Sequence, residues 1–336
     1  MTRTLLRAAA AATALATAVS LAACSSDDDG DGGDGGSSNN AAASDGSFPT
    51  TVDTKFGEVT IEEAPQRVVA LGWGDAEIAL DLGVQPVGAS DWLGFGEDND
   101  GISPYNDDSY DDSPELLATE DVEYEKIAAL DPDLILNVRS AGDEDTHEQL
   151  SDIATTVSVP EGAESFTTTW DAQVELIAAA LGLPDKGDEL VTQVNDRIDE
   201  AKEANPDWAD KTASVVTQFG GGWGAYVAGD ARMGLITALG FQENQEVADL
   251  ADGNFYVDLS EENIDVTDSD VVVGFPIGTE TSEFEESSGW NRIGAVKDGR
   301  GIVADDDLTS AFSLGTPDAM IYAIDELQPQ LEEITS

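Results

Sequence analysis

The longest helical pattern in the sequence lies in the middle of the chain, at residues 166–206. Apolar residues recur there at helical spacing in two groups, first Trp170, Val174, Ile177 and Leu181, and then Leu190, Val194, Ile198 and Ala201. Gly182 and Pro184 interrupt the pattern, so we predict two helices. The second, over about residues 185–204, is expected to be roughly 30 Å long at 1.5 Å per residue. We interpret this segment as a helical connector.

Short apolar runs alternate with helical patterns on both sides of the connector. Before it, strands are predicted at residues 67–71, 86–89, 133–138 and 155–159, and helices at 75–82, 124–130 and 146–154. After it, strands are predicted at 213–219, 226–228, 270–274 and 301–304, and helices at 233–239, after Ser260 and from Thr316. Residues 52–61 predict an entry strand or a hairpin around Gly57. This alternation predicts an α/β protein, with two α/β lobes of mainly parallel sheets joined by a long connecting helix.

Two short patterns occur once on each side of the connector and support two similar lobes. The pattern E-x-I-x-x-x-D-x-D-[LV]-[IV] begins at Glu125 and again at Glu262. A Val-Val pair followed by Gly-Trp-Gly occurs around Trp73 and again around Trp223. Two matches in the same order favour duplicated architecture over chance.

The N-terminal residues predict an export signal followed by a tether. Residues 1–23 combine two arginines with an alanine-rich apolar run that is too short to favour a membrane span. The run ends in Leu-Ala-Ala-Cys at Cys24, which resembles the bacterial lipobox, so cleavage before Cys24 and its diacylation are expected. Residues 24–47 are rich in Asp, Gly, Ser and Asn and predict a disordered tether. The lobes are then expected at 48–165 and 207–336, on either side of the connector at 166–206.

The chain is strongly acidic, with a formal net charge of −56 from 14 Lys+Arg and 70 Asp+Glu. Nucleic acid is a poor partner for such a surface. Most of these carboxylates are interpreted as solvated faces that serve solubility or salt tolerance. The functional alternative for this acidity is a bias toward cationic or neutral ligands.

Catalytic and metal-binding motifs are scarce. The single histidine, His147, lies in an acidic segment that suggests a surface helix, and no G-x-S-x-G elbow, P-loop or G-x-G-x-x-G motif is present. One histidine and one cysteine cannot supply the usual ligands of a zinc or manganese site. The residues therefore predict no enzyme, no resident cofactor and no direct metal site. A hydrolase with paired carboxylates stays open as an alternative.

Aromatic residues and arginines stand at the ends of the predicted strands. In α/β sheets, ligands bind outside the carboxyl ends of the strands, so these residues are expected to line a cleft shared by the two lobes. An aromatic wall with a few fixed cations suits a bulky, partly apolar ligand that bears anionic oxygens. The alternative for each tryptophan is a half-buried core position. The candidate residues are Trp73, Trp92, Phe95, Arg139, Trp223, Tyr226, Arg232, Phe275 and Trp290.

With these residues in hand, the chain resembles the ferric-siderophore substrate-binding lipoproteins of bacterial ABC importers, a cluster that also holds cobalamin- and haem-binding proteins. The residues that carry the resemblance are 65–71, 82–88 and above all Glu-Lys-Ile-Ala-Ala-Leu-Asp-Pro-Asp-Leu-Ile at 125–135, with looser matches at 170–183 and 255–270. The resemblance covers nearly the whole mature chain. It implies two α/β lobes joined by one long helix and a cleft that closes little on binding.

The resemblance also implies partners. One exposed glutamate per lobe docks onto arginines of the permease dimer in that family, and by motif position these map to Glu125 and Glu262. Helix-start stabilisation is the alternative role for each glutamate. The expected protein is a monomer, lipid-anchored at Cys24 on the extracytoplasmic face of the cell membrane, whose iron is bound only through the siderophore.

The nature of the ligand follows from the cleft cations. Arg139 and Arg232 are the main candidates, with Arg292 as a third, and so few cations favour a neutral or cationic ferric hydroxamate. Haem or cobalamin on the same fold, with Tyr226 as a possible axial ligand, and a surface lipoprotein without a transport role stay open as alternatives.

Overall fold

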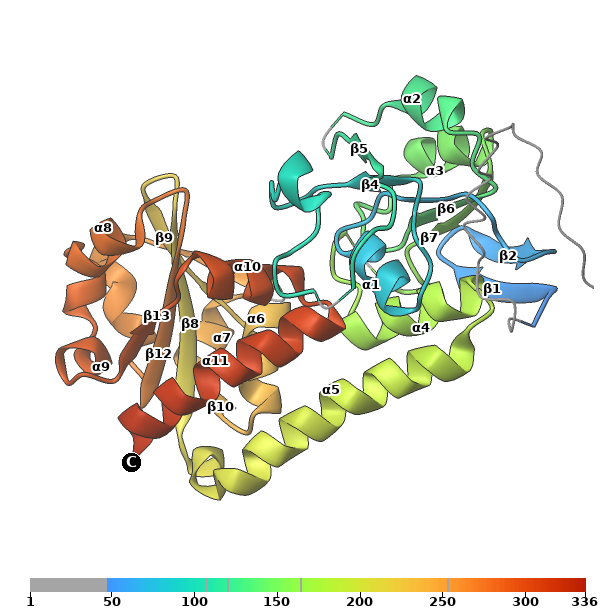
Figure 1. Ribbon diagram of the computed structural model, residues 1–336. Coiled ribbons are helices and arrows are strands. Elements are labelled where there is room, and N and C mark those ends of the chain that lie inside the picture. Colours follow the sequence, from blue (N-terminus) through green and yellow to red (C-terminus); the bar gives the residue numbers. More distant parts are fainter. Residues whose placement is uncertain (1–46, 107, 120, 164, 253) are drawn as a thin grey trace, which may run out of the picture. The chain divides into compact units, whose positions relative to one another are not determined.

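The first half of the chain forms a five-stranded sheet in which every neighbouring pair of strands is parallel. The computed structural model describes residues 47–336, apart from residues 107, 120, 164 and 253 (Figure 1). The strand order is β5 (Glu115–Leu117), β4 (Gly88–Ser90), β3 (Val68–Ala70), β6 (Leu134–Asn137) and β7 (Thr155–Ser158). An antiparallel hairpin of β1 (Thr50–Thr54) and β2 (Gly57–Ile61) precedes it, as predicted.

Apolar side chains on both faces explain why β3 and β6 are central strands. Val68 and Ala70 pack on one face with α1 (Asp75–Asp81) and α4 (Trp170–Ala180), whereas Val69 packs on the other with α2 (Tyr124–Ala129) and α3 (Glu144–Ser151). Parallel strands that are covered on both faces read as continuous apolar runs. This pattern is why their positions were predictable.

The second half of the chain forms a mixed sheet. Its order is β11 (Tyr256–Leu259), β9 (Gly222–Tyr226), β8 (Thr212–Phe219), β12 (Val271–Ile277) and β13 (Gly301–Val303), and β10 (Gln242–Glu243) also pairs with β8. β8, β12 and β13 are parallel neighbours, as predicted. β9 returns antiparallel to β8 through a tight turn between Phe219 and Gly222, and it covers residues that precede the strand predicted at 226–228.

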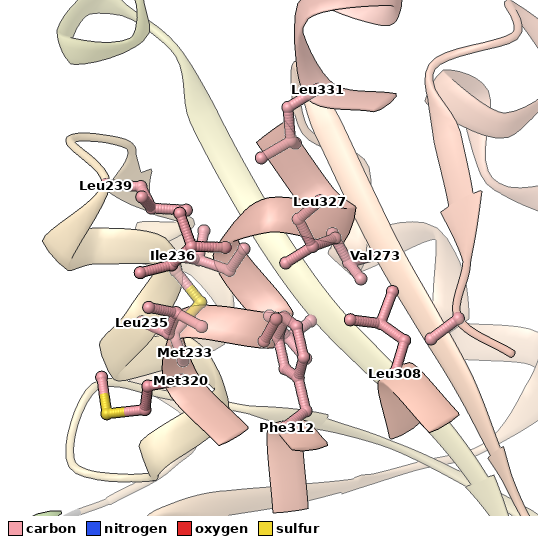
Figure 2. Packing of buried hydrophobic residues seen from close by; sticks show 14 of the residues in the cluster. Met233, Leu235, Ile236, Leu239, Val273, Leu308, Phe312, Met320, Leu327 and Leu331 are labelled. Carbon is pink, nitrogen blue, oxygen red and sulfur yellow. The ribbon is translucent and has the colours of Figure 1, made fainter. Parts of the chain in front are cut away.

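Helices cover both faces of this sheet and complete two apolar layers. One layer contains side chains of α6 (Ala231–Ala238), α10 (Asp306–Leu314) and α11 (Pro317–Thr335) against β12, and Figure 2 shows them converging on Val273 and Phe312. The other layer contains side chains of α7 (Gln245–Leu250), α8 (Thr281–Glu286) and α9 (Gly294–Lys297). Short 3-10 turns lie at Glu97–Asn99, Pro206–Asp210, Glu261–Thr267 and Trp290–Arg292.

The predicted connector consists of two helices with different packing. Val174 and Ile177 of α4 are buried in the core of the first sheet. α5 (Pro184–Ala204) contacts both cores, with Leu190 packed against the first and Val194 and Ile198 buried in the second. The long connecting helix is therefore α5, and α4 packs as part of the first lobe.

The two lobes also touch beside the connector. Thr316, just before α11, donates a hydrogen bond from its Oγ1 to the buried Glu77 carboxylate of α1 at 3.1 Å. Tyr105 of the first lobe stacks on Tyr322 of α11 with ring centroids 4.8 Å apart. These contacts hold the ends of α1 and α11 together.

The N-terminal predictions concern residues beyond this description. The signal at residues 1–23, Cys24 and all but the last residue of the predicted tether at 24–47 lie outside the described residues. Among the residues that are described, none of the helices is both long and apolar enough to cross a membrane.

Candidate functional site

A cavity of about 540 Å³ lies where the two lobes meet. This volume falls within the roughly 300–1,000 Å³ typical of small-molecule sites. The first lobe and the start of α4 contribute Trp73, Arg139, Phe166 and Trp170, and the second lobe contributes Tyr226, Arg232, Phe255, Phe312 and Met320. A groove of about 600 Å³ also runs along α5, but polar and charged residues line most of it.

The buried carboxylate of Asp75 fixes the first-lobe side of the cavity. It accepts hydrogen bonds from the backbone N–H of Gly72 at 3.1 Å and of Val138 at 2.8 Å, and from Nε2 of Gln173 at 2.7 Å. The same Gln173 amide donates to the carbonyl of Trp73 at 2.9 Å. The loops that carry Trp73 and Arg139 are thus tied to α1 and α4 through one side chain.

The two glycines that flank Trp73 are required by this arrangement. A Cβ on Gly72 would lie 2.2 Å from a carboxylate oxygen of Asp75. Gly74 has a left-handed φ of 82° and caps α1, and a Cβ there would lie 2.8 Å from Thr316 of the second lobe.

Burial raises the pKa of Asp75 to about 6, while the N–H groups that donate to its carboxylate act in the opposite direction and lower it.

Three aromatic rings build the first-lobe wall. Trp73 stacks on Trp92 with centroids 5.5 Å apart and an interplanar angle of 12°. Phe166 presents its edge to both indoles. Phe166 has a positive φ of 55°, an uncommon backbone conformation for a non-glycine residue, and its N–H donates to the carbonyl of Ser140 at 2.8 Å. The guanidinium of Arg139 lies over Trp73 at 5.5 Å from the ring centroid.

The second-lobe wall repeats this combination of aromatic stacking and arginine. Tyr226 stacks on Phe275 with centroids 5.8 Å apart. The guanidinium of Arg232 lies 4.4 Å from the Tyr226 ring centroid and 5.6 Å from that of Phe275. Each lobe therefore holds an arginine against an aromatic face. The attraction between the positive guanidinium and the ring fixes the orientation of the arginine N–H groups.

Three buried N–H groups of cavity-lining residues lack a hydrogen-bond acceptor within the described part of the chain. They are Nε1 of Trp73, Nε of Arg139 and Nε of Arg232. Leaving a buried donor unpaired costs roughly 1–3 kcal/mol, so such groups call for a partner. All three are donors, and each nitrogen is itself covered by protein atoms, although its residue lines the cavity.

The two cavity arginines differ in how their charges are balanced. Arg232 forms an ion pair with Asp230 at 2.8 Å, and only about a tenth of each side chain is exposed. Arg139 donates from Nη1 to the carbonyl of Leu314 at 2.5 Å. Burial lowers the pKa of Arg139 to about 10, and the neighbouring positive charge of Arg232 acts in the same direction.

The predicted site residues fall into three groups in the structure. Trp73, Arg139, Tyr226 and Arg232 line the cavity. Trp92, Phe95 and Phe275 do not line it: Trp92 and Phe275 support its walls, and Phe95 packs against the second-lobe core. Trp223 and Trp290 lie elsewhere, at 3% and 4% exposure in the opposite apolar layer of the second sheet.

Strand alternation explains the difference at Trp223. Side chains at 223, 225 and 227 point to one face of the sheet and Tyr226 to the other. The expectation that Trp223 and Trp290 line the cleft is corrected accordingly, because Trp223 lies within a returning strand and not in a loop beyond one. Arg292 is also outside the cavity, on the surface, where it pairs with Asp265 at 3.1 Å.

Several lining residues were not predicted. Phe166, Thr168 and Trp170 precede or begin α4, and Asp230 precedes α6. A dense Phe-Thr-Thr-Thr-Trp run before a helix was the available signal for the first group. Asp230 had no signal, because one carboxylate among 70 Asp+Glu residues carries no information.

The described residues contain no group of three or more His, Cys, Asp or Glu side chains arranged to hold a metal ion. His147 stacks on Phe56 with centroids 4.3 Å apart, and its Nδ1 lies 2.8 Å from Oγ of Ser158. It is not among the cavity-lining residues.

Glu125 and Glu262 occupy equivalent positions in the two lobes. Each is exposed in the first turn of a short helical segment, Glu125 in α2 and Glu262 in the 3-10 turn Glu261–Thr267. α2 is followed by β6 and the 3-10 turn by β12, which pair with β3 and β8 respectively. The repeat that begins at these glutamates therefore corresponds to the same part of both lobes.

Two α/β lobes, a long connecting helix and a donor-rich cavity between the lobes define a solute-binding protein. A sequence profile described as periplasmic binding protein matches residues 68–308. The chain therefore belongs to the periplasmic binding protein family.

Individual relatives agree with this assignment. The chain is 30% identical over 281 residues to the probable siderophore-binding lipoprotein YfiY of Bacillus subtilis, with 79% of this chain and 82% of the relative covered. A solved periplasmic solute-binding protein of Mycobacterium smegmatis is 27% identical with a TM-score of 0.71, over 85% of this chain and 99% of the other. The ferrichrome complex of Streptococcus pneumoniae PiaA shares the fold at 23% identity, with a TM-score of 0.70 over 85% and 98% of the two chains.

We expect Asp75→Asn to destabilise the protein. The asparagine N–H₂ group cannot accept the hydrogen bonds that backbone N–H groups now donate to the Asp75 carboxylate. The expected loss is about 3 kcal/mol of unfolding free energy, the order of one or two unpaired buried donors. Chemical denaturation followed by circular dichroism measures it. Asp133→Asn is the matched control, since Asp133 also accepts two backbone N–H groups but is exposed, and its effect should be smaller. Equal losses in the two variants would contradict the central role of Asp75.

Proposed function

We propose that this protein captures a ferric siderophore, with the hydroxamate type favoured, in the cavity between its lobes and delivers it to an ABC permease. The observation that carries the proposal is an aromatic-walled cavity between the lobes in which each lobe holds one arginine on an aromatic face, Arg139 on Trp73 and Arg232 on Tyr226. The names of its relatives support the same function, because YfiY is described as a probable siderophore-binding lipoprotein. The protein makes and breaks no bond of its ligand.

A ferric hydroxamate satisfies the chemistry of this cavity. Its iron is wrapped in hydroxamate oxygens that can accept hydrogen bonds from the guanidinium groups of Arg139 and Arg232. Its aliphatic backbone suits the rings of Trp73, Phe166 and Tyr226. Three hydroxamates neutralise Fe(III), and a neutral ligand suits a cavity in which one arginine already has its counter-ion. The iron is cargo, held through the siderophore and not by protein ligands.

The arrangement of the described residues gives no support to haem as the ligand. His147, the single histidine of the chain, stacks on Phe56 and does not line the cavity. Tyr226 does line it, but burial raises the pKa of its hydroxyl. A tyrosinate ligand to haem iron is therefore disfavoured.

We infer that Cys24 anchors the mature protein by lipid to the extracytoplasmic face of the membrane, where it acts as a monomer. The lipobox-like residues before Cys24 support this, and so do the three Bacillus subtilis relatives, all of which are named lipoproteins.

The two exposed glutamates, Glu125 and Glu262, are the docking contacts for the permease dimer. No described side chain pairs with either carboxylate, so both are available to a partner. A carboxylate and a guanidinium form a directional, often bidentate pair, and one such pair on each lobe would set the orientation of docking.

Titration of the purified protein with ferric trihydroxamate should quench its tryptophan fluorescence saturably, because Trp73 lines the cavity and Trp92 stacks on it. The same ligand should raise the melting temperature. Ferric catecholate, ferric citrate, haem and cobalamin are the comparison ligands, each with an inner-filter control. Failure of all iron complexes to bind would refute the proposed function, and tighter binding of catecholate or citrate would refute the hydroxamate preference.

Changing both Glu125 and Glu262 to alanine should abolish siderophore uptake by cells and leave the affinity of the purified protein for its ligand within about twofold. Uptake of radioactive iron as the ferric siderophore measures the first quantity, and fluorescence titration the second. The matched control is the Glu144→Ala, Glu246→Ala pair, which removes one exposed first-turn glutamate from another helix of each lobe. Normal uptake in the Glu125/Glu262 variant, or equal loss in the control, would exclude docking through these positions.

A further inference from the structure

We infer, on the basis of the proposed function, that Asp230 determines ligand specificity by acting as a built-in counter-ion that excludes anionic ferric complexes from the cavity. Asp230 lines the cavity, and its carboxylate pairs with an arginine of the same wall.

Both oxygens of the Asp230 carboxylate are engaged. Oδ1 accepts the backbone N–H of Arg232 at 2.9 Å and caps the N-terminus of α6. Oδ2 pairs with Nη1 of the same arginine at 2.8 Å. The cap fixes the carboxylate relative to the helix, so the ion pair is part of the framework and not a flexible surface contact.

The remaining contacts of Arg232 restrict the orientation of its guanidinium group and thus its ability to bind an anionic ligand. Its Nη2 donates to Oγ of Ser313 at 3.3 Å, and its guanidinium lies over the rings of Tyr226 and Phe275. Of the five N–H donors of Arg232, one Nη1–H is therefore paired with a carboxylate and one Nη2–H with a hydroxyl, so the planar fork that would bind a ligand carboxylate in a bidentate manner is partly occupied within the protein.

The charges around the cavity cancel. Four of the lining residues are charged, the arginines Arg139 and Arg232 and the aspartates Asp171 and Asp230. The buried carboxylate of Asp75 lies directly behind Arg139, whose backbone N–H it accepts at 3.4 Å. A neutral ferric complex loses no ion pair on entering, whereas a complex with net negative charge meets carboxylates in a partly desolvated site where charge interactions are strong.

The test uses Asp230→Asn, because asparagine can keep the helix cap while removing the charge. The measured quantity is a selectivity ratio, the Kd of an anionic ferric tricatecholate divided by the Kd of a neutral ferric trihydroxamate. We expect this ratio to fall at least tenfold in the variant, since one charge close to the ligand is removed. Fluorescence titration at constant ionic strength gives both constants.

Asp171→Asn is the matched control, because Asp171 lines the same cavity but forms no ion pair with an arginine in the described structure. Its effect on the ratio should be at most a third of that of Asp230→Asn. The double variant Asp230→Asn, Arg232→Gln removes one charge of each sign and should return the ratio to within threefold of the wild-type value. Thermal melts confirm that each variant is folded.

The outcomes separate the two proposals. An unchanged ratio in Asp230→Asn, or an equal change in Asp171→Asn, overturns the role of Asp230 while siderophore binding stands. If the wild-type protein binds neither complex, the proposed function fails and this inference fails with it.

Discussion

The hydrogen bonds of one buried carboxylate, Asp75, hold together the segments on which the cavity depends. Asp75 lies in the first turn of α1. Its carboxylate accepts hydrogen bonds from N–H groups of the loop after β3, of the residue that follows β6, and of α4. Because a buried carboxylate is costly unless its oxygens are satisfied, these segments are constrained to one arrangement. Gly72 permits the close approach of this carboxylate, and Trp73 and Arg139 are placed as a result.

The two sides of the cavity reach a similar chemistry by different local structures. In the first lobe, Arg139 lies on Trp73, which follows a parallel strand. In the second, Arg232 lies on Tyr226, which ends an antiparallel strand, and its charge is matched by Asp230. Arginines held on aromatic faces present oriented N–H groups with little loss of side-chain entropy on binding. This preorganisation suits recognition of a bulky ligand by its oxygens.

Much of the fold was predictable from the sequence because β3, β6, β8 and β12 are apolar on both faces and α5 keeps one apolar stripe over 21 residues. The glutamate repeat also marked equivalent elements of the two lobes. The second Gly-Trp-Gly led to the wrong prediction that Trp223 lines the cleft. A turn at Gly220 and Gly221 places this segment in the antiparallel strand β9. The pairing of Asp230 with Arg232 depends on a helix cap and its tertiary surroundings, and in so acidic a chain no local pattern distinguishes it.

The most direct measurement of the central claim is an anomalous difference map at the iron absorption edge, from crystals of the protein grown with a ferric trihydroxamate. The account predicts one strong iron peak inside the cavity bounded by Trp73, Arg139, Tyr226 and Arg232, with siderophore oxygens within hydrogen-bond distance of the Arg139 and Arg232 guanidinium groups. A single peak in the groove along α5, or in the hollow beside Trp223 and Glu261, would contradict it.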